Sequence, residues 1–159
     1  MKISAGILPF KTYDNHIKLF LVHMGGPFWK NRDLGAWSIP KGEVKDNETL
    51  LDAAKREFFE ETSKRIDGDF IDLGEVKTQN KIIHIFAINK DLDTDIKSNL
   101  FELEWPPKSN KIQKFPEVDK AEWFDIDEAY KKIVKSQKPF LDRLKAYLSK
   151  TVKIFSPFL

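Results

Sequence analysis

Cysteine is absent from the 159-residue sequence, glycine and proline are sparse at seven and eight residues, and charge of neither sign dominates. Without cysteine the chain has no disulfides, no thiolate nucleophile and no cysteine-ligated zinc, which fits a reducing compartment. The 27 Lys and Arg residues against 25 Asp and Glu residues leave a formal charge of +2. Because this charge is too small to attract a polyanion across a whole face, we expect no nucleic-acid partner.

Long hydrophobic runs are also missing. No stretch approaches the roughly 20 apolar residues that are needed to cross a bilayer. The apolar run near the N-terminus is too short for a signal peptide, and Pro9 interrupts it. These features predict a cytoplasmic protein with no membrane partner.

The remaining composition is typical of a globular protein. Hydrophobic residues make up 41% of the chain and charged residues 33%, which excludes an intrinsically disordered protein. At roughly 150 residues per domain, the length corresponds to a single domain. Because the sequence contains no internal repeat or linker, we expect that domain to span residues 1–159.

Hydrophobic periodicity predicts a mixture of strands and helices. Strands are expected at 3–10, 17–23, 70–76, 81–88 and 118–124, and the first two form a hairpin. Helices are expected at 49–63, with Asn47 or Thr49 as the N-cap, and at 127–134 and 139–150. The segment 24–42 is predicted to be a long loop, and the segment 91–117 to be functional or partly mobile because it is too long for an ordinary connection. The fold class is therefore α/β or α+β, built in layers.

The predicted helix at 49–63 carries an unusual stripe of acidic residues. On a helix, Glu57, Glu60 and Glu61 stand at positions i, i+3 and i+4, so three carboxylates share one side. Each adjacent like-charged pair costs about 0.2–0.5 kcal/mol in an isolated helix, so the stripe favours a counter-charge. Because carboxylate oxygens are hard ligands, the sequence predicts Mg²⁺, with Mn²⁺ as a substitute. A solvated acidic helix face is the alternative interpretation.

Neighbouring residues favour the metal site over the solvated face. Ala54 and Phe58 lie beside the acidic stripe on the helix, so the stripe borders the core. Gly42, which precedes the helix, has no Cβ and allows the backbone to approach a ligand closely. The sequence therefore predicts a packed site in which a metal ion bridges the protein to phosphate.

Seven residues of this segment match the spacing of a known motif. The segment resembles the Nudix box, in which Gly, five residues, Glu, seven residues, Arg-Glu, an apolar residue, one residue and Glu-Glu follow one another. The matching residues are Gly42, Glu48, Arg56, Glu57, Phe58, Glu60 and Glu61. Ser63 and Lys64 depart from the Gly and the aliphatic residue that follow in the family. Because a left-handed residue other than Gly costs roughly 1 kcal/mol, we expect the helix to run past Ser63 and to end near Gly68.

The resemblance to Nudix hydrolases implies both a fold and a chemistry. The fold would be an α/β/α sandwich with a mixed sheet, and the reaction a metal-dependent hydrolysis of nucleoside diphosphates linked to another group. By match to the box, Glu57, Glu60 and Glu61 would bind the metal. Glu57, as a candidate base, Glu61 and Arg56 would be catalytic, and Glu48 would brace the loop or the helix start.

Further site residues are expected outside the acidic stripe. Lys41, directly before Gly42, is placed to meet a phosphate, although a surface lysine is the alternative. Trp29 and Trp37 are candidates for stacking on a base, although anchoring a loop or the core is the commoner role. Nudix proteins often carry a further acidic residue on a later loop, and here Glu102 and Glu104 are both candidates.

The segments 25–29, 37–43 and 115–118 are similar to those of a bacterial Nudix group related to dinucleoside polyphosphate hydrolases. This resemblance implies a nucleotide or dinucleotide substrate, and first of all diadenosine tetraphosphate, cut to ATP and AMP. The second hypothesis is a nucleoside triphosphate pyrophosphohydrolase. The third is an enzyme that removes pyrophosphate from the 5′ ends of RNA. A catalytically silent module that senses nucleotides is the alternative from a different class. Monomer and homodimer both remain open.

Overall fold

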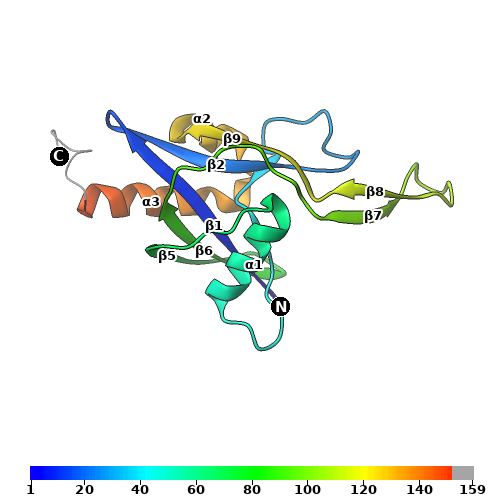
Figure 1. Cartoon of the computed structure of the whole chain (residues 1–159), viewed down its shortest axis with the longest axis horizontal. Helices are drawn as coiled ribbons and strands as arrows, with labels where there is room; N and C mark the ends of the chain where they lie inside the picture. Colours follow the sequence, from blue (N-terminus) through cyan, green and yellow to red (C-terminus); the bar gives the residue numbers. More distant parts are fainter. Residues whose placement is uncertain (152–159) are drawn as a thin grey trace.

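A mixed sheet forms the centre of the fold in the computed structural model (Figure 1). The structure describes residues 1–151, so residues 152–159 of the predicted domain lie outside the described part. The strands of the sheet are β1 Lys2–Tyr13, β2 His16–Met24, β3 Trp37–Ser38, β4 Lys41–Glu43, β5 Phe70–Lys77, β6 Lys81–Asn89 and β9 Val118–Asp125. Their order is β3-β2-β1-β6-β5, while β4 also pairs with β1 and β9 with β2. The central pair, β1 with β6, is parallel, and its neighbours are antiparallel.

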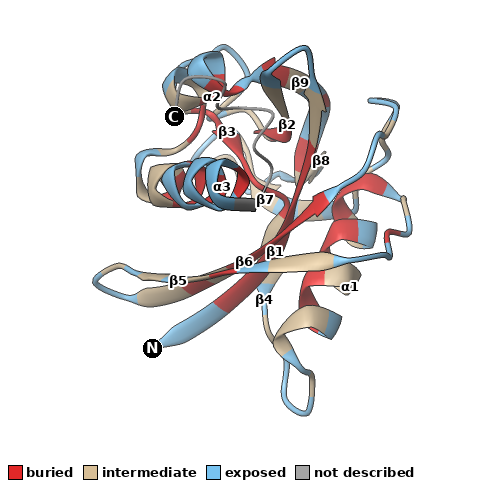
Figure 2. Cartoon of the chain, turned by 90° about the vertical axis from the view of Figure 1, so that its left-hand side faces the viewer, coloured by how far each residue is buried: buried red, intermediate tan, exposed pale blue. Residues whose placement is uncertain are grey.

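Helices cover both faces of this sheet (Figure 2). They are α1 Leu50–Thr62, α2 Ile126–Lys132, the 3₁₀ helix η1 Lys135–Gln137 and α3 Lys138–Thr151. Phe58 of α1 packs on one face of the sheet against Ile7 and Phe20, and Leu144 of α3 packs on the other face against Leu21. The expected α/β/α sandwich with a mixed sheet is therefore confirmed. No helix within residues 1–151 combines the length and the apolar character that are required to span a membrane.

The structure confirms all five predicted strands and all three predicted helices close to their expected ends, except for the predicted extension of the first helix past Ser63. The β1–β2 hairpin pairs Tyr13 with His16, and both intervening residues have positive φ, 46° at Asp14 and 65° at Asn15. Two regions without predicted strands do contain them. The predicted loop at 24–42 holds β3 and the first residues of β4, and the segment 91–117 forms the antiparallel strands β7 Leu100–Glu104 and β8 Ile112–Pro116.

The helix that carries the acidic stripe begins and ends at residues with defined capping contacts. Thr49 is the N-cap, and its Oγ1 accepts a hydrogen bond of 3.1 Å from the Asp52 N–H. The predicted extension past Ser63 is wrong, because Ser63 adopts the left-handed conformation with φ 63° and donates its N–H to the Phe59 carbonyl at 2.7 Å. The Ser63 hydroxyl also donates to the Lys97 carbonyl at 2.6 Å. This tertiary contact offsets the cost of a left-handed residue that has a Cβ.

Candidate metal and phosphate site

Three carboxylates converge beside the C-terminal half of α1. Glu57 and Glu61 come from the helix, and Glu117 lies between β8 and β9; one oxygen of each lies within 4.8 Å of the others. Glu57 is only 9% exposed and Glu61 only 7% exposed. Because buried carboxylates are unfavourable unless a cation or hydrogen-bond donors compensate them, this group has the burial and the spacing of a metal site.

Gly42 makes the position of Glu57 possible. Pairing of β4 with β1 sets Gly42 opposite Ala5. A Cβ added to Gly42 would lie 2.0 to 2.2 Å from the three atoms of the Glu57 carboxyl group, far inside van der Waals contact. The missing Cβ of Gly42, which was expected to make room for a ligand, makes room for the carboxyl group of Glu57 against the backbone.

Arg56 fixes the acidic side chains on the outer side of the helix. Its Nε donates to Glu48 Oε2 at 2.7 Å, and its Nη1 donates to Glu57 Oε1 at 3.0 Å and to Glu60 Oε2 at 2.6 Å. Its Nη2 donates to Glu48 Oε1 and to the Glu43 carbonyl, both at 2.9 Å. One guanidinium group therefore ties the start of the helix, the end of β4 and two residues of the acidic stripe together.

Glu48 connects the turn before α1 to Arg56. Its Oε1 accepts the Lys45 N–H at 2.8 Å, so the side chain links the turn before the helix to Arg56. Hydrogen bonds from Arg56 and then from the Lys45 backbone lower the pKa of Glu48 to about 2. The carboxylate of Glu48 is therefore ionised throughout the neutral range.

Without a cation, burial and mutual repulsion disfavour the ionised form of the converging carboxylates. Burial raises the pKa of Glu57, and burial followed by repulsion from Glu57 raises the pKa of Glu61 well above its ordinary value. Burial and the charge of Glu60 also raise the pKa of Glu117. A bound divalent cation reverses these shifts, because it replaces the protons that would otherwise neutralise the site.

The donor set fits magnesium. All three converging groups offer carboxylate oxygens, and no His or Cys belongs to the group within residues 1–151. Oxygen-only sites suit Mg²⁺ and Mn²⁺, and Mg²⁺ keeps several water ligands that substrate phosphates replace. A pocket of about 470 Å³ adjoins the site and is lined by Glu43, Val44, Lys45, Asp46, Arg56, Glu57 and Glu60. The structure therefore offers both the ligands and the space for a hydrated ion.

Glu60 and Glu117 differ from the predicted arrangement. Glu60 lies outside the converging group, and its carboxylate is engaged by Arg56. Glu117 takes the third position and is fixed by its backbone, because its N–H donates to the Asn99 carbonyl and its own carbonyl accepts the Gly25 N–H, both at 2.9 Å. The signal for Glu117 was its place in the segment 115–118, directly before a predicted strand, but no periodic pattern marks it.

Glu102 and Glu104 lie away from the converging group. Both belong to β7, where Glu102 pairs with Lys114 of β8. Glu104 accepts the backbone N–H groups of Lys108 at 3.3 Å and Asn110 at 3.1 Å, so its carboxylate stabilises the turn of the hairpin. The later acidic residue that the structure brings to the site is Glu117 and not either of these two.

The remaining candidates comprise one core residue, Trp37, and two partly buried residues, Trp29 and Lys41. Trp37 is 1% exposed, stacks edge-on against Phe124 and donates its Nε1 hydrogen to Asp33 at 2.9 Å, so it has no ring face free for a base. Trp29 is half-buried beside Phe28, in the loop after β2. Lys41 lies beside the acidic site, where burial and the neighbouring charge of Lys81 lower the pKa of its ammonium group while Glu61 and Glu57 act in the opposite direction.

Comparison with known proteins identifies the family. The model of the NUDIX domain matches residues 2–144, which include the whole acidic site and nearly all of the sheet and its helices. The chain belongs to the Nudix family. Together with the complete carboxylate set, this membership makes it a Nudix hydrolase of nucleoside diphosphate-linked substrates, acting on phosphoric anhydride bonds.

Solved structures agree with the fold at low sequence identity. The NUDIX domain of Shewanella oneidensis NrtR complexed with ADP ribose gives a TM-score of 0.64 at 13% identity over 92% of this chain and 87% of that one. A Caenorhabditis elegans Ap4A hydrolase gives 0.58 at 16% identity over 94% and 99%. A MutT/nudix family protein from Enterococcus faecalis gives 0.55 at 16% identity over 78% of this chain but only 43% of its own. A comparison with curated proteins found no match.

Proposed function

We propose that this Nudix hydrolase uses Mg²⁺ to cleave nucleoside polyphosphates, with diadenosine tetraphosphate, cut asymmetrically to ATP and AMP, as its first substrate. The observation that carries the proposal is the convergence of Glu57, Glu61 and Glu117 within 4.8 Å, with the Glu57 carboxyl group packed against Gly42. The similarity to an Ap4A hydrolase over nearly the full length of both chains supports the choice of a dinucleotide substrate. The ADP-ribose complex of another neighbour supports a nucleotide substrate more generally.

In this proposal each side chain has a distinct role. Glu57, Glu61 and Glu117 would hold the metal, and Glu60 would act by positioning Arg56. A bound metal ion would lower the pKa of its water and offset the charge that builds on the phosphate oxygens. Glu57 would accept a proton from the attacking water.

The reaction needs no covalent intermediate with the protein. The oxygen of the water forms a bond to phosphorus while the anhydride bond to the leaving phosphate breaks. Lys41, at the edge of the acidic site, would neutralise a phosphate oxygen of the substrate, and the half-buried Trp29 would stack on a base.

The test is a comparison of substrates with the purified chain in the presence of Mg²⁺. Diadenosine tetraphosphate, GTP, oxidised GTP and ADP-ribose are incubated separately, and the products are resolved by anion-exchange chromatography. We expect ATP and AMP from the first compound at the highest kcat/KM. Faster release of pyrophosphate from GTP or oxidised GTP would instead establish the triphosphate pyrophosphohydrolase.

A binding experiment distinguishes an enzyme from a nucleotide sensor. Mg²⁺ binding is measured by isothermal titration calorimetry on the same preparation that is assayed for hydrolysis. Binding of metal and nucleotide without any product would overturn catalysis and favour the silent module. The buried carboxylates argue against that outcome, because a site that only binds nucleotides gains nothing from three acidic groups that repel the substrate phosphates.

A further inference from the structure

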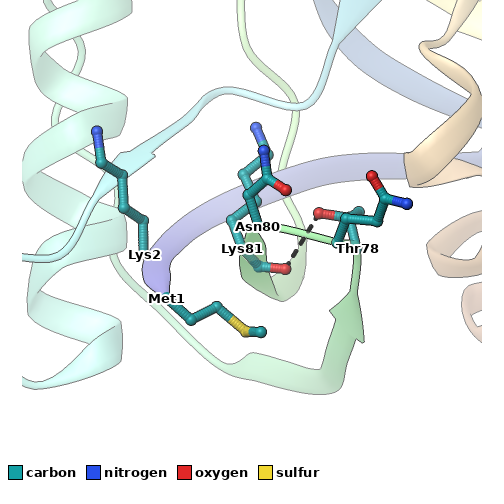
Figure 3. A pocket seen from close by; sticks show the side chains of 6 residues that line it. Met1, Lys2, Thr78, Asn80 and Lys81 are labelled. Atoms are coloured by element: carbon teal, nitrogen blue, oxygen red, sulfur yellow. Dashed lines mark hydrogen bonds between the residues drawn. The ribbon is translucent and has the colours of Figure 1, made fainter.

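The connections between strands are held in two different ways. In the short turn between β5 and β6, Thr78 donates its hydroxyl hydrogen to the Lys81 carbonyl at 3.2 Å, so the turn closes on itself (Figure 3). The longer loop of residues 25–36, which follows β2, is held in its middle by a side chain of the core. His23 is only 2% exposed, and its Nε2 lies 2.6 Å from the Arg32 carbonyl oxygen. A buried imidazole is therefore part of the anchorage of this loop.

The second ring nitrogen of His23 points toward β9. Its Nδ1 lies 2.8 Å from Asp119 Oδ1, and the ring packs edge-on against the buried Trp37 with 5.1 Å between the ring centroids. Because the carbonyl and the carboxylate are both acceptors, a ring that carries hydrogen on both nitrogens donates at both ends. His23 therefore joins the loop to β9 through two separate contacts.

Asp119 belongs to a β-bulge next to the acidic site. Between the pair His23–Lys120 and the next pair of the ladder, β9 has one residue more than β2, and that residue is Asp119. A shift by one residue reverses the face on which the following side chains stand, and bulges beside active sites aim side chains in this way. Glu117, the third converging carboxylate, comes two residues before Asp119. The contact between His23 and Asp119 therefore holds the bulge that sets the direction of Glu117.

The loop that His23 anchors touches the site at two points. The Gly25 N–H donates to the Glu117 carbonyl at 2.9 Å, so the start of the loop lies directly against the metal-site segment. The Arg32 N–H donates to the Trp29 carbonyl at 2.9 Å, so the carbonyl that His23 holds belongs to the turn that carries Trp29. A converging carboxylate and the candidate stacking residue therefore both depend on one imidazole.

We propose that His23 is a positioning residue of this hydrolase: its Nδ1 fixes the bulge that aims Glu117, and its Nε2 fixes the turn that presents Trp29. The inference rests on the proposed function, because it assigns how two of the proposed site residues are held. Since each ring nitrogen serves a different element, the two contributions can be separated by experiment.

Two substitutions of His23 each retain one donor. The amide nitrogen of Asn lies near the position of Nδ1 in His, and that of Gln lies near the position of Nε2. His23→Gln should weaken Mg²⁺ binding about tenfold and lower kcat, with KM nearly unchanged, because the support of Glu117 is lost. His23→Asn should raise KM about fivefold, with kcat and Mg²⁺ binding nearly unchanged. Titration calorimetry gives the Mg²⁺ affinity, and steady-state kinetics use the nucleotide that the parent hydrolyses fastest.

Limited digestion with trypsin follows the loop without any turnover. Trypsin cleaves after Lys30 and Arg32, which are both exposed in the loop, and the rate of cleavage reports how often the segment opens. His23→Asn should be cut at these residues about threefold faster than the parent, whereas His23→Gln should be cut at the rate of the parent. Mass spectrometry of the fragments identifies the sites.

Two further variants separate positioning from general damage to the core. Asp119→Ala changes an exposed residue and should weaken Mg²⁺ binding as His23→Gln does. His16→Gln replaces an exposed histidine at the start of the same strand and should change none of these quantities. Equal losses in kcat, KM and melting temperature for both His23 variants would overturn the inference, and so would parent-like values for both. Mg²⁺ binding and tryptic cleavage need no turnover, so failure of the proposed hydrolysis would be seen separately in an inactive parent.

Discussion

The Nudix box at 42–61 and the β7–β8 hairpin both contain acidic residues that suit a metal site, yet only the box brings them together. In the box, Gly42, Arg56 and the core-facing side of α1 hold Glu57 and Glu61 in partly buried positions. In the hairpin, strands β7 and β8 pair only with each other, and they leave Glu102 exposed. The comparison shows that acidic residues become a candidate site where backbone packing converges on them, and remain structural where hydrogen bonds within one hairpin satisfy them.

Glu61→Gln should produce the largest difference between the two regions. We expect turnover to fall by about 100-fold or more, because the variant loses one charge from the metal site. The melting temperature should equal or exceed that of the parent, since the substitution removes a buried carboxylate that is repelled by Glu57. Steady-state kinetics and calorimetric melting check both results, and Glu102→Gln in the hairpin should change neither quantity. Full activity of Glu61→Gln would disprove the site.

Gly42→Ala should displace a carboxylate of the Nudix box without removing any charge from the site. The added methyl group would displace the carboxyl group of Glu57, and a misplacement of about 1 Å in a catalytic group costs about 100-fold in rate. Measured kcat should therefore fall by about that factor, and the unfolding free energy by about 1–3 kcal/mol from overpacking. Adding Glu57→Asp, which shortens the clashing side chain, should restore part of the stability but not the activity. A fully active Gly42→Ala variant would show that Glu57 need not lie against the backbone.

Glu117→Gln and Glu102→Gln compare an acidic residue of the converging group with one of the β7–β8 hairpin. We expect Glu117→Gln to weaken Mg²⁺ binding by about 10- to 100-fold, the range seen when a supporting group of a metal site is lost. Glu102→Gln should leave it unchanged, because Glu102 lies outside the converging group. Titration calorimetry with Mg²⁺ measures both constants. If Glu102→Gln weakened Mg²⁺ binding and Glu117→Gln did not, the third acidic residue of the metal site would be Glu102 of the β7–β8 hairpin.

Trp29→Ala tests whether the loop after β2 contributes to substrate binding. Loss of a stacked base costs about 1–3 kcal/mol, so KM should rise about tenfold with kcat nearly constant. A rise in KM with little change in melting temperature supports stacking. A lower melting temperature at constant KM would identify Trp29 as a packing residue, which its contact with the core also allows.

The smallest expected effect is a dependence of stability on pH. The pKa of Glu48 is lowered from 4.5 to about 2 in the folded chain, so its contribution to stability is present above pH 4.5 and is lost as the pH falls toward 2. Urea unfolding should therefore show Glu48→Gln less stable than the parent near neutral pH and the two converging in this acidic range. A difference that stays constant with pH would show that the ion pair with Arg56 contributes nothing to this dependence.

Much of the fold could be predicted because it depends on local patterns. Short apolar runs marked the five main strands, and the closeness of the first two runs in sequence marked the first hairpin. The short strands β3 and β4 and the β7–β8 hairpin were missed, because two or three residues show no periodicity and because the hairpin buries little. The end of α1 was missed for a different reason: Lys97, far along the chain, accepts the hydroxyl hydrogen of Ser63.

The features of the site also divide into those that local sequence determined and those that depended on tertiary contacts. The spacing of Gly42, Glu48, Arg56, Glu57 and Glu61 follows from contacts within 20 residues, so the sequence alone determined the helical part of the site and its bracing ion pairs. The identity of the third converging carboxylate and the burial of Trp37 depend on which strands pair. Only the tertiary structure decided these features, because strand pairing joins residues that are distant in sequence and that carry no shared local pattern.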